Sequence, residues 1–302
     1  MIKKKDFLKE YNIDKETFAQ AGMKWAELNA IYDSYCAIEG RLKAIGREFV
    51  NDYLYDIEGA GIHSYRYRTK KPGHLLEKII RKRSESPEEY KYIDRKNYYK
   101  YMTDLIGIRV FFLYREDWIY FHNYIISRFE NNPELYLEDR LTDFDEDPEH
   151  NYIAEKPKVY RRTGDTRIYD KRQIEIRSEG IYRSLHYIIK YKGYYIEIQG
   201  RTLFEEGWSE IDHDIVYPYF MDDEMLSDFS TLLNRLAGMA DEMSSYFRRI
   251  KQQKLEAEKN PSGIKKEQVP DGEMAPEKVI GLDEGPVKKK ERKNKEKQKG
   301  NG

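Results

Sequence analysis

An acid, an amide and a base stand two residues apart in the second half of the chain, at Glu197, Gln199 and Arg201. Side chains two apart on a β-strand point to the same face. The stretch that holds them, Tyr182–Arg201, has two arms rich in β-branched and aromatic residues, which is typical of strands. Between the arms, Lys192-Gly193 provides a two-residue turn with glycine where a positive φ is needed. The sequence therefore predicts a β-hairpin with one face that meets something polar.

A second charged pair belongs to the apolar run 105–113, where Asp104 stands at the entrance and Arg109 interrupts the run. A nearly continuous apolar run predicts a central strand that is buried on both faces. A charge within such a strand is costly unless it is paired or liganded. Arg109 is therefore a stronger candidate for a functional site than a surface arginine.

A basic segment, residues 63–83, carries Arg66, Arg68, Lys70 and Lys71 before Pro72-Gly73. A helix is predicted to begin near His74. Backbone amides at a helix N-terminus act together with nearby cations on a polyphosphate. The same charges also fit a solvated helix face with buried aliphatic stems, so charge alone leaves both interpretations open.

Apolar periodicity predicts helices over 14–58, 116–129, 202–213 (with Trp208 and Ile211 inward) and 222–250. The stretch 130–172 is polar and long for a connection, so it is either a mobile functional loop or contains short strands. From about residue 254 apolar residues become scarce, and a disordered charged tail is expected. The predicted organisation is a helical segment (1–60), a core (61–220), a C-terminal helix (221–252) and the tail (253–302).

Composition narrows the class of protein. Lys and Arg number 54 and Asp and Glu 55, for a net charge of −1, so a basic surface for nucleic acid would have to be local. The single cysteine, Cys36, excludes an internal disulfide and a cysteine-based zinc site. Because no apolar run reaches the length of a membrane span and the first residues lack the apolar core of a signal peptide, a cytoplasmic protein without a membrane partner is expected.

Four motifs taken together resemble the synthetase domain of the RelA/SpoT family and, by size, its small alarmone synthetases. They are Arg68-x-Lys70 followed by Glu77-Lys78, the run DLIGIRV from Asp104, G-x-YRSLH from Gly180, and EIQGRT from Glu197 running into W-x-x-I-D-H from Trp208. The resemblance covers about residues 61–220. It implies an α+β, nucleotidyltransferase-like mixed β-sheet flanked by helices, here with extra N- and C-terminal helices and the tail.

The implied activity is transfer of the β,γ-pyrophosphate of ATP to the ribose 3′-hydroxyl of GDP or GTP, which makes (p)ppGpp. Asp104 and Glu197 match the family's Mg²⁺-binding Asp and its essential Glu, which acts as a ligand, as a general base, or as both. The ATP-binding set is matched by basic residues, namely Arg68, Lys70, Lys78 and, at the floor of the site, Arg109. The acceptor side is matched by Tyr182, on which the acceptor base stacks, and by Arg177, His186, Gln199 and Arg201.

The sequence departs from the family pattern at several places. His74 replaces a small serine, Ile181 separates Gly180 from Tyr182, the nearest base before the tyrosine is Arg177 rather than lysine, and Gly200 replaces an apolar residue. Since the last three are expected on the acceptor side, other acceptors stay open. Toxins of the family modify adenine nucleotides or the 3′ end of tRNA and are neutralised by an antitoxin, and an inactive nucleotide or RNA binder is a further alternative. His213-Asp214 resembles the HD dipeptide of phosphohydrolases, but no upstream histidine cluster accompanies it, so no hydrolase domain is expected.

Overall fold

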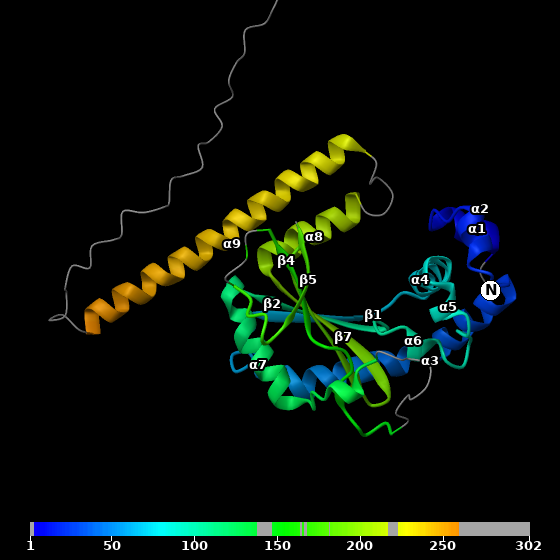
Figure 1. Ribbon diagram of the computed structural model, residues 1–302, viewed down its shortest axis with the longest axis horizontal. Coiled ribbons are helices and arrows are strands. Elements are labelled where there is room, and N and C mark those ends of the chain that lie inside the picture. The colour runs from blue at the N-terminus through cyan, green and yellow to red at the C-terminus, as the bar shows by residue number, and fades with distance from the viewer. Residues whose placement is uncertain are drawn as a thin grey trace, which may run out of the picture. The chain divides into compact units, whose positions relative to one another are not determined.

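The computed structural model describes residues 3–137, 147–163, 165, 168–180, 182–216 and 223–259 (Figure 1). Residues 253–259 were expected to begin the disordered tail but are helical, because the last described helix continues to Lys259. The rest of the expected tail, from residue 260 onward, lies outside the described residues, as do the acidic part of the polar stretch (138–146) and Tyr217-Pro218. Two compact units are distinguished, residues 1–253 and 254–302. The description below concerns the first unit. No helix among the described residues combines the length and the apolarity that crossing a bilayer requires.

The described strands form a mixed sheet of seven, in the order β1-β2-β7-β6-β4-β5 with β3 paired to β6. Strands β2 and β7 run parallel, as do β4 and β5, and the other pairs are antiparallel. This confirms the α+β mixed sheet flanked by helices. The strands are β1 Ser64–Thr69, β2 Ile106–Phe112, β3 Tyr152–Ile153, β4 Lys158–Arg162, β5 Glu175–Gly180, β6 Ser184–Tyr191 and β7 Tyr194–Thr202.

Helices cover the two faces of the sheet, with α3 and α7 on one side and α8 and α9 on the other (Figure 1). Short 3₁₀ turns, η1 (Arg115–Asp117) and η2 (Pro133–Leu135), flank α7. The helices are α1 Lys4–Glu10, α2 Lys15–Gln20, α3 Trp25–Tyr53, α4 Pro72–Glu85, α5 Pro87–Tyr90, α6 Tyr98–Tyr101, α7 Trp118–Arg128, α8 Leu203–Ile215 and α9 Glu224–Lys259.

The predicted hairpin is confirmed as β6 and β7. Lys192 and Gly193 have φ of 48° and 77°, as a two-residue turn with two left-handed positions requires. The register places His186 opposite Gln199. Residues two apart then share a face, so Glu197, Gln199 and Arg201 lie together on the side of α8.

The interior of β2 differs from the prediction. Ile106, Ile108 and Val110 are buried, but Gly107 and Arg109 between them are half-buried on the other face. The expectation of burial on both faces was wrong, because one face of the sheet packs on α3 while the other lines a cavity.

Two further expectations are corrected, and one open alternative is resolved. The predicted helix 14–58 is divided into α2 and α3 at Gly22, whose φ is +61°, and α3 ends at Tyr53. Ile211 does not point inward, since it is 47% exposed, whereas Trp208 is buried. Of the two alternatives for the polar stretch 130–172, the described part contains short strands, β3 and β4.

Candidate active site

A cavity of about 820 Å³ opens between the polar face of the sheet, α4, α8 and the first residues of the chain. Residues on or next to β1, β2, β7 and α4 that the sequence singled out form much of its wall. These are Arg68, Lys70, Lys78, Asp104, Arg109, Glu197 and Gln199. The tertiary structure thus brings together residues that are up to 131 positions apart in the chain.

Asp104 is held by two lysines. Lys70 Nζ donates to its Oδ2 at 2.7 Å, and Lys78 Nζ lies 2.8 Å from the same oxygen. The backbone explains the first contact, since the Lys70 amide donates to the carbonyl of Leu105 where β1 ends and β2 begins. Burial by itself raises the pKa of Asp104, but the two ammonium groups outweigh burial and hold this pKa well below its ordinary value. Asp104 is therefore ionised.

The other carboxylate oxygen of Asp104, Oδ1, is buried and has no hydrogen-bond partner among the described residues. An unpaired buried carboxylate oxygen costs free energy unless something else binds it. Because Asp104 lies at the cavity wall, the natural partner of this oxygen is a cation or a donor group of a bound molecule.

Glu197 lies on β7, opposite Gly107 of the neighbouring strand β2. Because glycine has no side chain, no side chain from β2 lies directly beside the Glu197 carboxylate. Gln199 Nε2 donates to Glu197 Oε2 at 2.9 Å, and His186 Nδ1 lies 3.5 Å from Oε1. Burial raises the pKa of Glu197, but the contact with His186 outweighs burial, and the net pKa is lowered. The charge of Asp104 acts in the opposite direction, so the two acids are close enough to repel each other.

This pair of acids fits a magnesium ion. The described residues contain no cluster of three or more metal-binding side chains. Magnesium does not need one, because it usually takes one or two carboxylates and completes its shell with water and phosphate oxygens. The orphaned Asp104 Oδ1 and the ionised Glu197 on one cavity provide that minimal set.

Arg109 is bound to α8 rather than free in the cavity. Its Nη1 donates to Glu206 Oε1 at 2.7 Å and also contacts Glu210. Arg66 on β1 binds the same two glutamates, at 3.3 and 2.8 Å. Arg68 lines the same wall, where burial and the charges of Arg109 and Arg66 lower its pKa. Crowded cations of this kind favour an anion in the cavity.

Tyr182 lies beside the cavity, not in its wall. The guanidinium of Arg201 lies 5.0 Å from the centre of the Tyr182 ring, and Arg201 Nη2 donates to the phenol oxygen at 2.5 Å. His186 is 6.4 Å from the same ring, edge-on. Arg201 also donates to Gln199 Oε1 at 2.8 Å, and Gln199 in turn donates to Glu197. Hydrogen bonds therefore connect Glu197 to the ring of Tyr182 through Gln199 and Arg201.

Comparisons with known proteins agree with this arrangement of motifs. The sequence profile described as the region found in RelA / SpoT proteins matches residues 67–222, which is more than half of the chain. The chain belongs to the RelA/SpoT family. A search of curated proteins found no match.

Solved structures of low sequence identity are similar to this RelA/SpoT-family chain. Small alarmone synthetase 1 from Bacillus subtilis bound to its product pppGpp is 19% identical, with a TM-score of 0.41 over 74% of this chain and 96% of that one. A GTP pyrophosphokinase family protein from Streptococcus pneumoniae is 21% identical, with a TM-score of 0.46 over 76% and 97%. Small alarmone synthetase 2 from Bacillus subtilis is 17% identical, with a TM-score of 0.41 over 73% and 97%.

Part of the cavity lies outside the RelA/SpoT region and was not anticipated. Tyr11, Asn12 and Thr17, from α2 and the loop before it, line the cavity. The one signal in the sequence was His74, which departs from the family pattern and whose ring lies edge-on to Tyr11 at 5.3 Å. At the end of α8, His213 and its neighbour Asp214 line the cavity too. Glu206 and Glu210 were likewise missed, because nothing in a single helix shows which arginines it will meet.

Two acceptor-side expectations of the RelA/SpoT resemblance are placed elsewhere. Arg177 lies on β5, two strands beyond the hairpin, is about half exposed and pairs with Glu175 at 3.0 Å. Gly200 faces the apolar side of the sheet, where an added Cβ would lie 2.9 Å from the ring of Phe112. The expectation that Gly200 touches the acceptor side was wrong, because its neighbours Gln199 and Arg201 take the opposite face.

Proposed function

We propose that this RelA/SpoT-family chain is a pyrophosphokinase that transfers the β,γ-pyrophosphate of ATP to the ribose 3′-hydroxyl of GDP or GTP. The observation that carries the proposal is the placement of two ionised acids, Asp104 and Glu197, on one cavity with the ammonium groups of Lys70 and Lys78. Transfer from a triphosphate depends on alignment and charge neutralisation more than on covalent help from the protein.

The basic side chains bind and align the triphosphate. Lys70 and Lys78 share one oxygen of Asp104 in the ligand-free protein, and each ammonium has further donors for phosphate oxygens. Arg68 and Arg109 extend the positive wall, and the planar guanidinium of Arg68 also suits stacking on adenine. Asp104 Oδ1 and Glu197 would hold Mg²⁺, which when bound neutralises charge on the transferred group.

Glu197 is placed to receive the proton of the acceptor hydroxyl. The 3′-oxygen attacks the β-phosphorus of ATP, the bond from that phosphorus to the oxygen shared with the α-phosphate breaks, and AMP leaves with the electron pair. The hydroxyl proton passes to the Glu197 carboxylate, which Gln199 and His186 orient through its two oxygens. Tyr182, held on one side by Arg201, presents its ring for stacking of the acceptor base.

Several of the basic residues that could contact a tRNA backbone are neutralised by acids within the protein. Of the basic residues that an RNA backbone could contact, Arg66, Lys158 and Arg162 are paired with glutamates, whereas Lys71 and Lys156 are exposed. Arg161 is buried. Because an RNA backbone is bound mainly by unneutralised Lys and Arg along its length, these pairs reduce the number of contacts that the described surface offers to tRNA.

The test is transfer of label from ATP labelled on its terminal phosphate, with GDP, GTP, AMP, ATP and tRNA offered separately. We expect labelled guanine nucleotide. Label on tRNA or on an adenine nucleotide would replace the proposed acceptor and keep the chemistry. If no acceptor is labelled although ATP binds, the chain is a binding protein and the proposal fails.

Two variants test the roles. Glu197→Gln is expected to abolish transfer with the thermal midpoint unchanged, while Glu134→Gln at an exposed site serves as the matched control and keeps full activity. Tyr182→Ala is expected to raise the KM for the acceptor about tenfold or more, as the loss of roughly 1–3 kcal/mol of stacking requires, and to leave the KM for ATP unchanged. An equal rise in both KM values would contradict the stacking role.

A further inference from the structure

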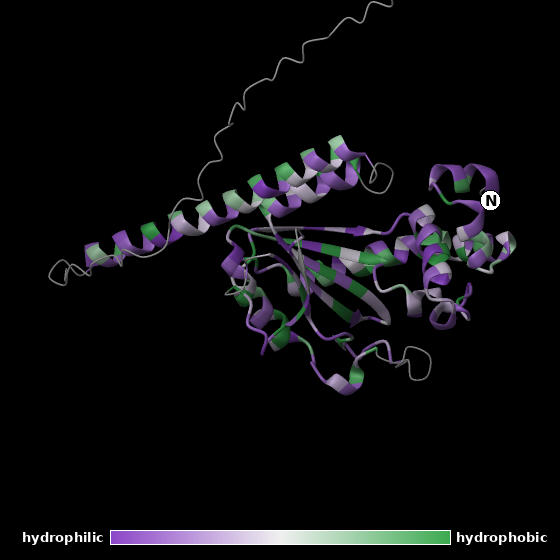
Figure 2. Ribbon diagram, turned by 45° about the horizontal axis from the view of Figure 1, so that its top comes forward, coloured by the Kyte–Doolittle hydropathy of each residue, from purple (hydrophilic) through white to green (hydrophobic). Residues whose placement is uncertain are grey.

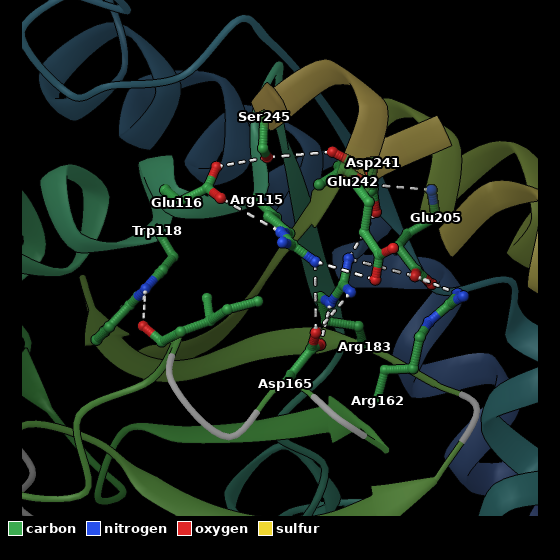
Figure 3. A network of polar contacts seen from close by, with 12 residues as sticks. Arg115, Glu116, Trp118, Arg162, Asp165, Arg183, Glu205, Asp241, Glu242 and Ser245 are labelled. Carbon is green, nitrogen blue, oxygen red and sulfur yellow. Dashed lines mark hydrogen bonds and ion pairs between the residues drawn. The ribbon is translucent and has the colours of Figure 1, made fainter. Parts of the chain in front are cut away.

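Helix α9 is packed on the rest of the protein by its polar side. Asn234, Asp241 and Ser245 are buried, with Ala237 and Gly238 between them. Figure 3 shows Asp241 facing Arg183, and Ser245 facing Glu116, on the side of α9 that packs against the rest of the protein. The usual arrangement of an amphipathic helix, with the apolar side inward, is therefore reversed.

The apolar side of α9 is exposed instead. Figure 2 shows hydrophobic residues recurring along the helix. They follow one another in steps of four and three, and each is more than half exposed: Met225, Phe229, Leu232, Leu236, Met239, Met243 and Tyr246. A hydrophobic repeat of 3.5 residues per turn is the signature of a coiled-coil seam rather than of a general apolar face.

The residues that flank this seam indicate which helix covers it. On one edge, Asp228, Arg235, Glu242 and Arg249 are exposed, seven residues apart and alternating in sign. Glu242 also lies 3.5 Å from Arg115, and it remains largely exposed. The other edge carries no charge, since the corresponding positions are Leu226, Leu233, Ala240 and Phe247.

An antiparallel copy of the same helix satisfies this pattern. When seam residues pack with Leu236 beside Met239 of the second copy, the charged edges of the two helices meet. Asp228 then faces Arg249 of the second copy, and Arg235 faces Glu242 of the second copy, so every pair has opposite signs. In a parallel pair each charged edge would face the uncharged edge of its partner, and no charges would pair.

We propose that α9 pairs antiparallel with α9 of a second copy of this chain, about a two-fold axis near residues 237–238. The seam from Met225 to Tyr246 is about 32 Å long at the helical rise per residue. The chain's own C-terminal segment is a poor occupant for it. In residues 260–302 four prolines interrupt the sequence, and the larger apolar residues do not recur in steps of three and four: they are Ile264, Val269, Met274, Val279, Ile280, Leu282 and Val287.

The first experiment measures the mass of the full-length protein by sedimentation or light scattering across a range of concentrations. We expect a dimer for the wild type. Leu236→Glu should raise the dimer dissociation constant by at least about 100-fold, because each dimer then buries two carboxylates at the seam. Leu236 is half exposed in the single chain, so the variant should still fold. Tyr92→Glu, at a comparably exposed aromatic residue, is the control and should leave the dimer intact.

The second experiment tests orientation. With Cys36→Ser to remove the exposed native thiol, a spin label at Lys251→Cys should give a distance of about 40 Å between copies in the antiparallel pair, against less than about 20 Å in a parallel one.

Asp228→Arg alone and Arg249→Asp alone should each weaken the dimer about tenfold, and the double variant should restore it. The proposal is overturned if the wild-type chain stays monomeric or if Leu236→Glu leaves the dimer intact. It is also overturned if the spin labels lie less than about 20 Å apart, or if the seam binds only a different protein.

Discussion

Replacing Arg183 tests how much the buried ion pairs between the sheet and α9 contribute to the stability of the protein. It is 3% exposed and lies in the centre of the network in Figure 3. Its guanidinium donates to Asp165 at 2.6 and 3.1 Å and to Asp241 at 2.5 Å. Burial lowers the pKa of Arg183, but the surrounding acids outweigh burial, and the net pKa is raised. Folding therefore favours its charged form.

Arg183→Met removes the cation and leaves Asp165, Glu205 and Asp241 as neighbouring buried acids. Breaking a buried pair by removing one partner costs about 3–5 kcal/mol, because the remaining charge is uncompensated. Arg162 still pairs with Glu205, so we expect about 4 kcal/mol. At about 2–4 °C per kcal/mol for a unit of this size, the thermal midpoint should fall by about 8–16 °C.

The assay is thermal unfolding together with transfer kinetics at a temperature where the variant remains folded. Arg183 points to α9 and away from the cavity, so the KM for ATP should be nearly unchanged. Arg172→Met, which removes an exposed arginine paired with Asp170, is the control and should move the midpoint by less than about 2 °C. A stable Arg183→Met protein with a KM for ATP raised tenfold would refute the reasoning, since it would place Arg183 on the substrate.

Burial raises the pKa of Glu205 to about 7 from an ordinary value of 4.5, so the stability that its proton provides is present below pH 4.5 and is lost as pH rises through 7. Glu205→Gln should flatten this fall in the thermal midpoint between pH 4.5 and 7, and an unchanged pH profile would show that Glu205 is not its source. Gly200→Ala should cost about 1–3 kcal/mol in urea unfolding, because its Cβ would lie 2.9 Å from Phe112, with no change in either KM. Lys78→Met should raise the KM for ATP about tenfold or more and leave the KM for the acceptor unchanged; a larger effect on the acceptor would remove Lys78 from the triphosphate side.

Local periodicity accounts for what the sequence predicted well. The hairpin follows from two β-prone arms and a glycine that adopts a positive φ. The polar face of β7 follows from alternation alone, since residues two apart on a strand share a side. Asp104 was found at the entrance of the apolar run and Glu197 on the polar face of the hairpin, and their roles were implied by the resemblance to the RelA/SpoT family.

Contacts between distant segments account for what the sequence did not predict. Arg109 was singled out correctly as an unusual charge, but its partners, Glu206 and Glu210, lie about a hundred residues later and only the crossing of α8 over the sheet reveals them. The contribution of Tyr11 to the cavity depends in the same way on how the first helices pack against α4.

The sequence by itself determined the elements, their amphipathic sides and the chemistry available on the polar face of the sheet, because strand alternation and helix periodicity are local properties. Only the tertiary structure decided which side of each element is covered. For α9 a periodic pattern is the same whether its apolar stripe faces inward or outward. The buried carboxylate of Asp241, bonded to Arg183 and Thr202, fixes the polar side inward and leaves the seam for a partner.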